Sequence, residues 1–230
     1  MQNIYQDGSY LASNPTWHEE DAPWKAAQIN KMIDRNHLKF QSVCEVGCGS
    51  GEILKELSIM WSHTSSFLGY EISPQAFSLC KNKVTSRLQF SLQDILQEDV
   101  FFDMVMAIDV FEHVEDYFNF LRQLKLKAKY KLFHIPLDLS SQAVLRGTPL
   151  LYVREKVGHI HYFTKETALA TLEDTGYTVL DHFYTGRSIE LASKSWKTRL
   201  LKMPRKLLFS SNPDIACRLL GGFSLLVLAV

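Results

Sequence analysis

Three glycines at alternate positions, between a short apolar run and a helical pattern, constrain the fold of this chain more than any other feature. Residues 40–46 suit a buried strand, and residues 53–57 suit the first turns of a helix. Gly47, Gly49 and Gly51 permit positive φ angles and let a ligand approach the backbone closely. The helix behind them offers free N–H groups and the positive end of its dipole. A bare strand-to-helix turn requires fewer glycines, so we interpret this segment as a cofactor cradle.

Strand and helix patterns alternate along most of the chain, which predicts a doubly wound, mostly parallel α/β sheet with helices on both faces. The strand patterns lie at 42–46, 66–71, 88–91, 103–109, 130–136 and 177–184, and the helical ones at 17–36, 51–60, 74–86, 113–127 and 164–175. Two stretches, 137–163 and 185–222, interrupt the alternation.

We divide the chain into an N-terminal arm and helix, 1–40, and one large domain, 41–230. Residues 137–163 are expected to be an insertion that shapes a substrate pocket, because such folds bind ligands beyond the carboxyl ends of their strands. The arm is rich in aromatic residues and could close over the cofactor as a lid or pack as ordinary core. Its members of interest are Tyr5, Tyr10, Trp17, Trp24 and Lys25.

The composition excludes one class of partner and suggests a compartment. The 230 residues carry 25 basic and 25 acidic side chains, so no overall positive field predicts nucleic-acid binding. The four cysteines show no ligand-like spacing and are expected to be free thiols in a reducing compartment. The first residues lack the pattern of a signal peptide, and we therefore expect a cytoplasmic protein.

Acidic residues follow successive predicted strands in the order that a nucleoside ligand would need. Glu71 ends a strand twenty residues after Gly51, where a carboxylate can accept both hydroxyls of a ribose. Asp94 follows the next strand and could accept a hydrogen bond from an exocyclic amine. Ile72 and Ile95 could sandwich a purine ring between them.

The segment from Asp103 to Val114, with its Glu112-His113-Val114 end, completes a pattern that resembles the class I S-adenosylmethionine-dependent methyltransferases. The similarity is greatest to the bacterial type 11/12 small-molecule group, including the later stretch 158–164. The resemblance implies a seven-stranded sheet whose last strand, from 223–230, is antiparallel. It also implies S-adenosylmethionine as cofactor, bound by Glu45, Gly47, Cys48, Gly49, Gly51, Glu71, Ile72, Asp94, Ile95 and Asp109.

Two alternative functions remain open at this stage. A NAD(P)-dependent oxidoreductase would need the spacing G-x-G-x-x-G, whereas the third glycine here comes one residue early. The acidic Glu45 would also repel a pyrophosphate, while it suits a cationic amine. A non-catalytic module that only binds S-adenosylmethionine is the second alternative.

The acceptor is expected to be a small molecule, such as a sugar, a lipid-linked compound or a quinone-like metabolite. Three histidines are candidates for a catalytic base: His113, His159 and His161. His159 and His161 would share a strand face if their segment is extended. No third ligand with recognisable spacing accompanies them, so we expect no metal.

Residues 194–206 contain six basic residues and no acidic one. Trp196, Leu200, Met203 and Leu207 recur at helical spacing, a pattern found in helices at membrane surfaces and in helices docked on a core. Pro204 is expected to interrupt the helix. Weak peripheral membrane contact through 194–209 and docking on the core are both compatible with this pattern.

Overall fold

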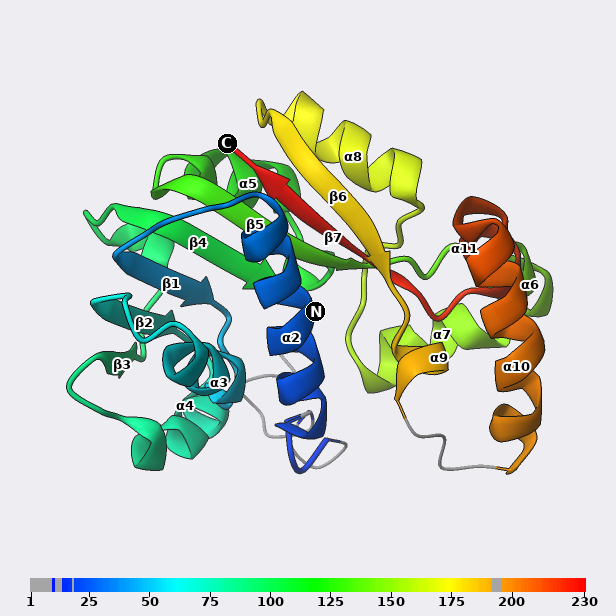
Figure 1. Ribbon diagram of the computed structural model, residues 1–230, viewed down its shortest axis with the longest axis horizontal. Helices are drawn as coiled ribbons and strands as arrows, with labels where there is room; N and C mark the ends of the chain where they lie inside the picture. Colours follow the sequence, from blue (N-terminus) through cyan, green and yellow to red (C-terminus); the bar gives the residue numbers. More distant parts are fainter. Residues whose placement is uncertain (1–9, 11–13, 18, 192–195) are drawn as a thin grey trace.

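The protein is described by a computed structural model that covers residues 10, 14–17, 19–191 and 196–230 (Figure 1); for 196–199 and 201 it describes the backbone alone. A seven-stranded sheet forms its centre, in the order β3-β2-β1-β4-β5-β7-β6. The strands are β1 Ser42–Val46, β2 Ser66–Tyr70, β3 Leu88–Ser91, β4 Phe102–Ile108, β5 Ala128–Pro136, β6 Val179–Thr185 and β7 Ser224–Ala229.

The direction of the strands confirms the predicted architecture. The first five strands are parallel, and β7 pairs antiparallel with both β5 and β6. The final apolar stretch of the sequence therefore takes the antiparallel position predicted for it.

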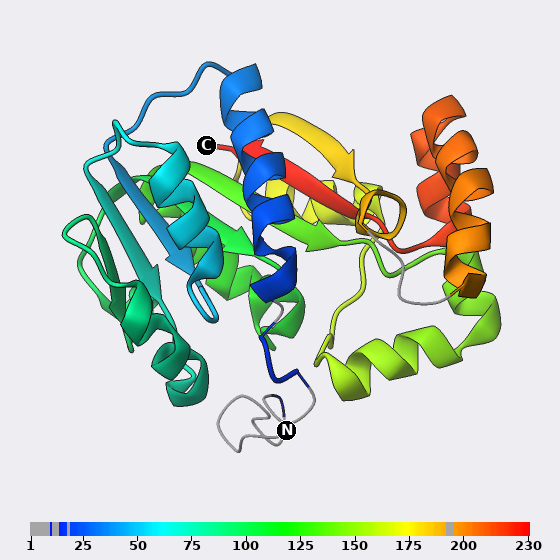
Figure 2. The ribbon, with the colours of Figure 1, turned by 60° about the horizontal axis from the view of Figure 1, so that its bottom comes forward.

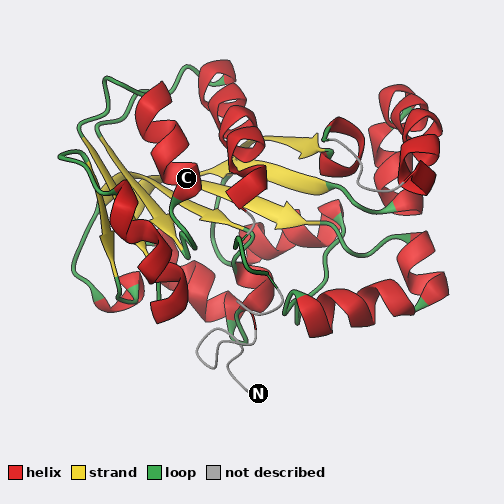
Figure 3. Ribbon diagram, turned by 90° about the horizontal axis from the view of Figure 1, so that it is seen from below, coloured by secondary structure: helices red, strands yellow, loops and turns green. Residues whose placement is uncertain are grey.

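Helices cover both faces of the sheet (Figure 3). Helices α2 Ala22–Arg35 and α3 Glu52–Met60 pack on one face, and α5 Tyr117–Lys125 and α8 Lys165–Asp174 on the other. The side chains of β4 alternate between the two faces. Met104 and Met106 pack in the core on the side of α2 and α3, and Val105 and Ala107 pack in the core on the side of α5 and α8. Because β4 is buried on both faces from Met104 onward, residues 104–108 are all apolar.

Three predicted helices are shorter than their patterns. The helix predicted over 17–36 begins only at Ala22. Helix α4 Pro74–Cys80 continues only as a 3-10 turn, η2 Lys81–Lys83. The predicted helix 113–127 begins later, at Tyr117, because the Asp116 side chain accepts a hydrogen bond from the Asn119 N–H and caps it there. The Glu112-His113 pair lies before it in the 3-10 turn η4 Phe111–His113; the remaining short turns are η1 Glu19–Asp21 and η3 Ile95–Gln97.

The two interrupting stretches form helices that gather at one end of the molecule, away from β2 and β3 (Figures 1 and 2). Residues 137–163 supply α6 Ser141–Arg146 and α7 Thr148–Lys156. Residues 185–222 supply α9 Arg187–Glu190, α10 Trp196–Ser211 and α11 Pro213–Leu220. The last three share a small core of Ile189, Ala216, Cys217 and Phe223.

Helix α10 corrects the expectation of a break at Pro204 and bears on the choice between docking and membrane contact. It runs through Pro204 without a break. Its apolar stripe is also not docked on the core, because Leu200, Met203 and Leu207 are 68%, 65% and 67% exposed. Lys194 lies outside the described residues, as do the side chains of Trp196, Lys197 and Arg199.

All four cysteines are free and buried, as the free thiols predicted from the sequence. Within the described ranges, no helix combines the length and the apolar composition needed to cross a membrane.

Candidate functional site

A cavity of about 430 Å³ lies at the carboxyl ends of β1, β4 and β5. The turn after β1 contributes Gly47, Cys48, Gly49 and Ser50 to its wall. Further wall residues follow the other two strands and come from the arm and the insertion, so segments far apart in the sequence meet here. They include Asp109, His113, His134, Pro136, Asp138 and His159.

The three cradle glycines all adopt positive φ angles, of 62° at Gly47, 57° at Gly49 and 77° at Gly51. A Cβ on Gly51 would lie 2.4 Å from the Phe90 ring, and one on Gly49 would lie 2.7 Å from the Trp17 ring. The turn therefore requires glycine for both its conformation and its packing. Because Gly47 and Gly49 lack side chains, their backbone forms part of the cavity wall.

Glu45 is buried at the end of β1 and contributes to the same wall. Its Oε2 atom has no hydrogen-bond partner in the described part of the chain. Burial raises the pKa of the Glu45 carboxyl well above its ordinary value, although Lys25 opposes this effect. An unsatisfied carboxylate oxygen at a cavity wall suits a cationic ligand group, and this observation fits the predicted cofactor.

The Glu71 carboxylate is attached to the cradle by backbone hydrogen bonds. Its Oε2 accepts the Gly49 N–H at 2.8 Å, and its Oε1 accepts those of Ile72 and Ser73, both at 2.8 Å. Burial nevertheless raises the pKa of Glu71, and these three hydrogen bonds only moderate the rise. A carboxylate oxygen has two lone pairs, so Oε2 can accept a ribose hydroxyl in addition to the Gly49 N–H.

The structure does not bring the predicted adenine-side residues together at the cavity. Ile72 is 55% exposed, and Asp94 is exposed and caps η3 by accepting the Leu96 N–H at 2.9 Å. Ile95 is only 1% exposed and belongs to the core under β4 and α5. Its side chain therefore has no accessible face for a purine ring, contrary to the expected sandwich, because the turn after β3 directs it inward.

Asp109 is the centre of a partly buried polar chain next to the cradle. It has a positive φ of 54°, and its carboxylate contacts Lys25 Nζ at 2.7 Å and His134 Nδ1 at 2.5 Å. Nε2 of His134 in turn lies 2.9 Å from the Thr185 hydroxyl. Burial alone would raise the pKa of Asp109, but His134 and Lys25 hold it below its usual range. Sequence reasoning did not identify His134, because its partner lies 25 residues away.

His113 and His159 both line the cavity, together with Glu45 and the glycine turn. His159 Nδ1 lies 2.6 Å from Asp138 Oδ2, and His113 Nδ1 lies 3.0 Å from the Gly158 carbonyl oxygen. Burial, followed by the neighbouring His159, lowers the pKa of His113 to about 4, so this imidazole is neutral at pH 7. No sequence pattern pointed to Asp138, because its pairing with His159 depends on the fold of the insertion.

His161 is turned away from the cavity, which corrects its place among the candidate bases. Its Nε2 lies 2.9 Å from the Val114 carbonyl oxygen, and its ring packs on Tyr117 at 4.5 Å between centroids. The prediction assumed an extended segment, but the segment is irregular. The N–H groups of Ile160 and His161 both donate to the Glu112 carbonyl oxygen, which bends the chain after His159.

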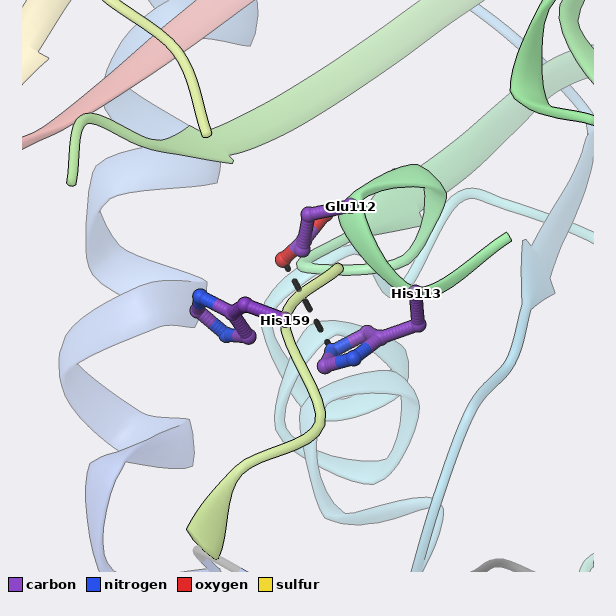
Figure 4. A group of neighbouring side chains, drawn as sticks. All are labelled: Glu112, His113 and His159. Carbon is purple, nitrogen blue, oxygen red and sulfur yellow. Dashed lines mark ion pairs between the residues drawn. The ribbon is translucent and has the colours of Figure 1, made fainter. Parts of the chain in front are cut away.

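Glu112, His113 and His159 form a cluster whose potential ligand atoms lie within 4.8 Å of one another (Figure 4). Glu112 Oε1 lies 3.9 Å from His113 Nε2, and neither carboxylate oxygen of Glu112 has a hydrogen-bond partner among the residues described. Bond lengths of about 2.1 Å would require shorter separations between ligands than the widest in this group. The cluster could hold a cation only after a shift of side chains, and the absence of a metal stays a prediction.

Of the five arm residues singled out in the sequence, four line the cavity wall: Tyr10, Trp17, Trp24 and Lys25. Trp24 Nε1 also donates to Glu190 Oε2 of α9 at 2.8 Å, which connects the arm to the helical end of the molecule. Tyr5 lies outside the described residues.

A family model described as "Methyltransferase domain" matches residues 17–182. No curated protein sequence matches the chain. Among solved structures, magnesium protoporphyrin IX methyltransferase from Synechocystis PCC 6803 with bound SAH has a TM-score of 0.58 at 16% identity, over 93% of this chain and 83% of that one. The N-methyltransferase NodS from Bradyrhizobium japonicum WM9, in complex with S-adenosyl-l-homocysteine, has a TM-score of 0.57 at 14% identity, over 89% and 84%.

The plantazolicin methyltransferase BpumL, in complex with a monoazolic desmethylPZN analog and SAH, has a TM-score of 0.61 at 16% identity, over 99% and 92%. At these identities the structural likeness establishes a shared fold.

Proposed function

The chain belongs to the methyltransferase domain family of class I S-adenosylmethionine-dependent enzymes, and on this premise we propose that it methylates a small-molecule acceptor. One observation carries the proposal. The glycine cradle and the Asp138–His159 pair line the same cavity of about 430 Å³. A donor and an acceptor can therefore be held side by side, which is the main requirement of an in-line displacement.

The donor side of the cavity would bind S-adenosylmethionine, which supplies an electrophilic methyl group when it is bound. The unpartnered Glu45 Oε2 would accept a hydrogen bond from the cationic amine of the donor, and Glu71 would accept from the ribose. Asp109 keeps its negative charge between Lys25 and His134 and fixes the wall beside the cradle. In this proposal the donor-binding residues are Glu45, Gly47, Cys48, Gly49, Gly51, Glu71 and Asp109, with Ile72 and Asp94 at the outer edge.

On the acceptor side, His159 acts as the general base for an acceptor hydroxyl. Its Nδ1–H donates to Asp138, which leaves Nε2 as the proton acceptor and stabilises the imidazolium that forms. His113 stays neutral beside it, because burial lowers its pKa to about 4. The aromatic arm residues would cover the bound donor and exclude water.

Calorimetry and a transfer assay test this function together. S-adenosylhomocysteine should bind to the wild-type chain, and Glu71→Ala should weaken the binding at least about tenfold, since a charge-assisted hydrogen bond contributes about 1.5–3 kcal/mol. The Asp94→Ala variant is the control at the exposed edge, with a smaller loss. The absence of binding in the wild-type chain would refute the proposal.

Transfer of a labelled methyl group into a metabolite extract, followed by mass spectrometry of the product, should then identify the acceptor. Tight binding without any transferred label would favour a non-catalytic binding module instead.

A second proposal concerns location: a cytoplasmic enzyme that touches the surface of an anionic membrane through its helical end. The exposed apolar residues of α10 support it, as do Leu145, Leu151 and Tyr152 on α6 and α7. Arg146, Arg154 and Lys206 are exposed on the same helices, and their charge is complementary to acidic lipids.

A further inference from the structure

A second cavity, of about 330 Å³, lies between the helices of the insertion and the pair α10–α11. It shares Asp138 and Gly222 with the first cavity, so the two adjoin at these residues. Its wall is largely apolar, with contributions from Ala143, Pro149, Leu150, Val153 and Leu220. An acceptor whose reactive end lies near His159 therefore has a second, apolar space into which it can extend.

Arg205 provides a positive charge at this second cavity, without a carboxylate partner in the described part of the chain. Its Nη2 donates to the carbonyl oxygens of Leu220 and Gly221. Its Nε is buried and has no hydrogen-bond partner there. The residue as a whole is half-buried, and its guanidinium lies over the Phe223 ring at 5.8 Å from the centroid. A buried N–H donor without an acceptor is costly, and such a group normally has a role.

The hydroxyl of Ser188 is a second unused donor at the same junction. It is buried, and it has no hydrogen-bond partner among the described residues. A Cβ on Gly222 would lie 3.2 Å from Arg205 Nη2 and 3.4 Å from Ser188 Oγ. The Nη2 end of the Arg205 guanidinium and the Ser188 hydroxyl therefore both approach Gly222, one of the two residues that the cavities share, and glycine leaves this space open.

From this arrangement we propose an anion-binding subsite, formed by Arg205 and Ser188, that holds a phosphate, sulfonate or carboxylate group of the acceptor. Arg146 lines the same cavity and adds positive charge. Asp138, the acidic residue in the wall of the second cavity, is already hydrogen-bonded to His159. The acceptor is accordingly an anionic amphiphile, whose apolar part occupies the second cavity. This inference rests on the proposed function, because it assigns the acceptor of that site.

Binding of octyl phosphate to the full chain, measured by calorimetry with S-adenosylhomocysteine present, tests both parts of the inference. Octyl phosphate should bind at least tenfold more tightly than octanol, which lacks the charge, and at least tenfold more tightly than inorganic phosphate, which lacks the chain. Octanol as tight as octyl phosphate would overturn the anion subsite. Inorganic phosphate as tight as octyl phosphate would overturn the apolar part.

Variants then locate the charge. Arg205→Gln should weaken octyl phosphate binding at least tenfold, Ser188→Ala and Arg146→Gln about threefold each, and Arg205→Lys less than Arg205→Gln. Lys206→Gln is the matched control: it removes a neighbouring exposed charge on α10 that does not line the cavity, and should change nothing.

The hydrogen bonds of Arg205 also connect α10 to the loop before β7, so substitutions there can lower stability. The thermal midpoint of each variant is therefore compared with that of the wild-type chain. If Arg205→Gln does not fold, the test of the subsite rests on Ser188→Ala and Arg146→Gln. Wild-type affinity for octyl phosphate in both of these variants would overturn the subsite. Affinity for S-adenosylhomocysteine should be unchanged in every variant. Failure of the subsite is thereby distinguished from failure of the proposed function, which would show as no donor binding at all.

Discussion

Gly51 occupies the most crowded position of the cradle, with φ of 77° and the Phe90 ring against its α-carbon. We expect Gly51→Ala to lower the free energy of unfolding by about 3 kcal/mol, since it adds a left-handed alanine and an overpacked contact. Gly147→Ala is the matched control, because φ there is 67° but nothing lies within 4 Å of the added Cβ. It should cost only about 1–2 kcal/mol. Urea unfolding measures both, and equal losses would contradict the packing argument.

The buried Glu112 carboxyl should make the free energy of unfolding depend on pH, and its replacement by glutamine should remove this dependence. Burial, followed by the charge of Asp109, raises its pKa well above the ordinary value of about 4.3. Its contribution to stability is then fully present below about pH 4.3 and is lost as the pH rises toward the folded-state pKa. Glu112→Gln stays neutral, so it should gain at least about 1 kcal/mol relative to wild type between pH 4 and pH 8. Chemical unfolding at several pH values in this range measures the gain. If the free energies of unfolding of Glu112→Gln and wild type differ by the same amount at every pH, the prediction is wrong.

The same cluster allows a test of the predicted absence of a metal. We expect a chelator such as EDTA to leave both the thermal midpoint and the methyl-transfer rate of the wild-type chain unchanged. His161→Gln serves as a control for the loss of a nearby imidazole that is turned away from the cluster. A lower midpoint with EDTA, restored by added zinc or manganese, would show that Glu112, His113 and His159 hold an ion.

Residue-level predictions succeeded where a local rule acts and failed where a distant contact decides. Positive φ angles at Gly47, Gly49 and Gly51 follow from the strand-to-helix turn, which is a local property. The orientation of His161 depends on the Glu112 carbonyl oxygen, almost fifty residues away in sequence. The partner of His159 likewise depends on the path of the insertion. No local pattern encodes such pairings.

At the scale of elements, α10 carries a prediction about membranes. Leu207 is 67% exposed on its apolar stripe, so Leu207→Glu should not affect folding but should reduce recovery with anionic vesicles severalfold. Co-sedimentation with phosphatidylglycerol-containing vesicles at low salt measures this. Ile59→Glu on α3 is the matched control, since Ile59 is equally exposed, at 67%, on a helix away from that end. Equal recovery of the wild-type chain with neutral and anionic vesicles would contradict the proposed membrane contact.

The strands of the sheet were predictable where they contain a short apolar run bounded by turn residues, and residues 104–108 of β4 show this most clearly. The packing of the helices in 185–222 was not predictable, because short amphipathic helices have the same pattern whether they cover a core or face solvent. Leu200 and Met203 illustrate the ambiguity: their spacing is helical, and only the position of α9 and α11 leaves their side chains exposed.

At the scale of the whole molecule, the order of the strands brings residues from distant parts of the sequence to one cavity. Strand β1 lies between β2 and β4, so the glycine turn and Glu71 meet at its carboxyl end. The chain continues from β5 into the insertion, which carries Asp138 and His159 to the wall of the same cavity. In the proposed function, the donor side is thus built from the strands of the common fold, while the acceptor side depends on segments added to it.

This division predicts that donor binding and methyl transfer can be impaired separately. Asp138→Asn should keep the geometry of the acceptor side but remove the charge that orients and stabilises His159, so the transfer rate should fall by a factor of about 10² or more. His159→Gln should lose at least as much, and the double variant little more, because the two residues act as a unit. Affinity for S-adenosylhomocysteine should stay at the wild-type value in all three, whereas Glu71→Ala should weaken it. Calorimetry and labelled-methyl transfer measured on the same preparations make the comparison. A full transfer rate in Asp138→Asn would mean that alignment beside the cradle suffices, and that the acceptor reaches it already deprotonated.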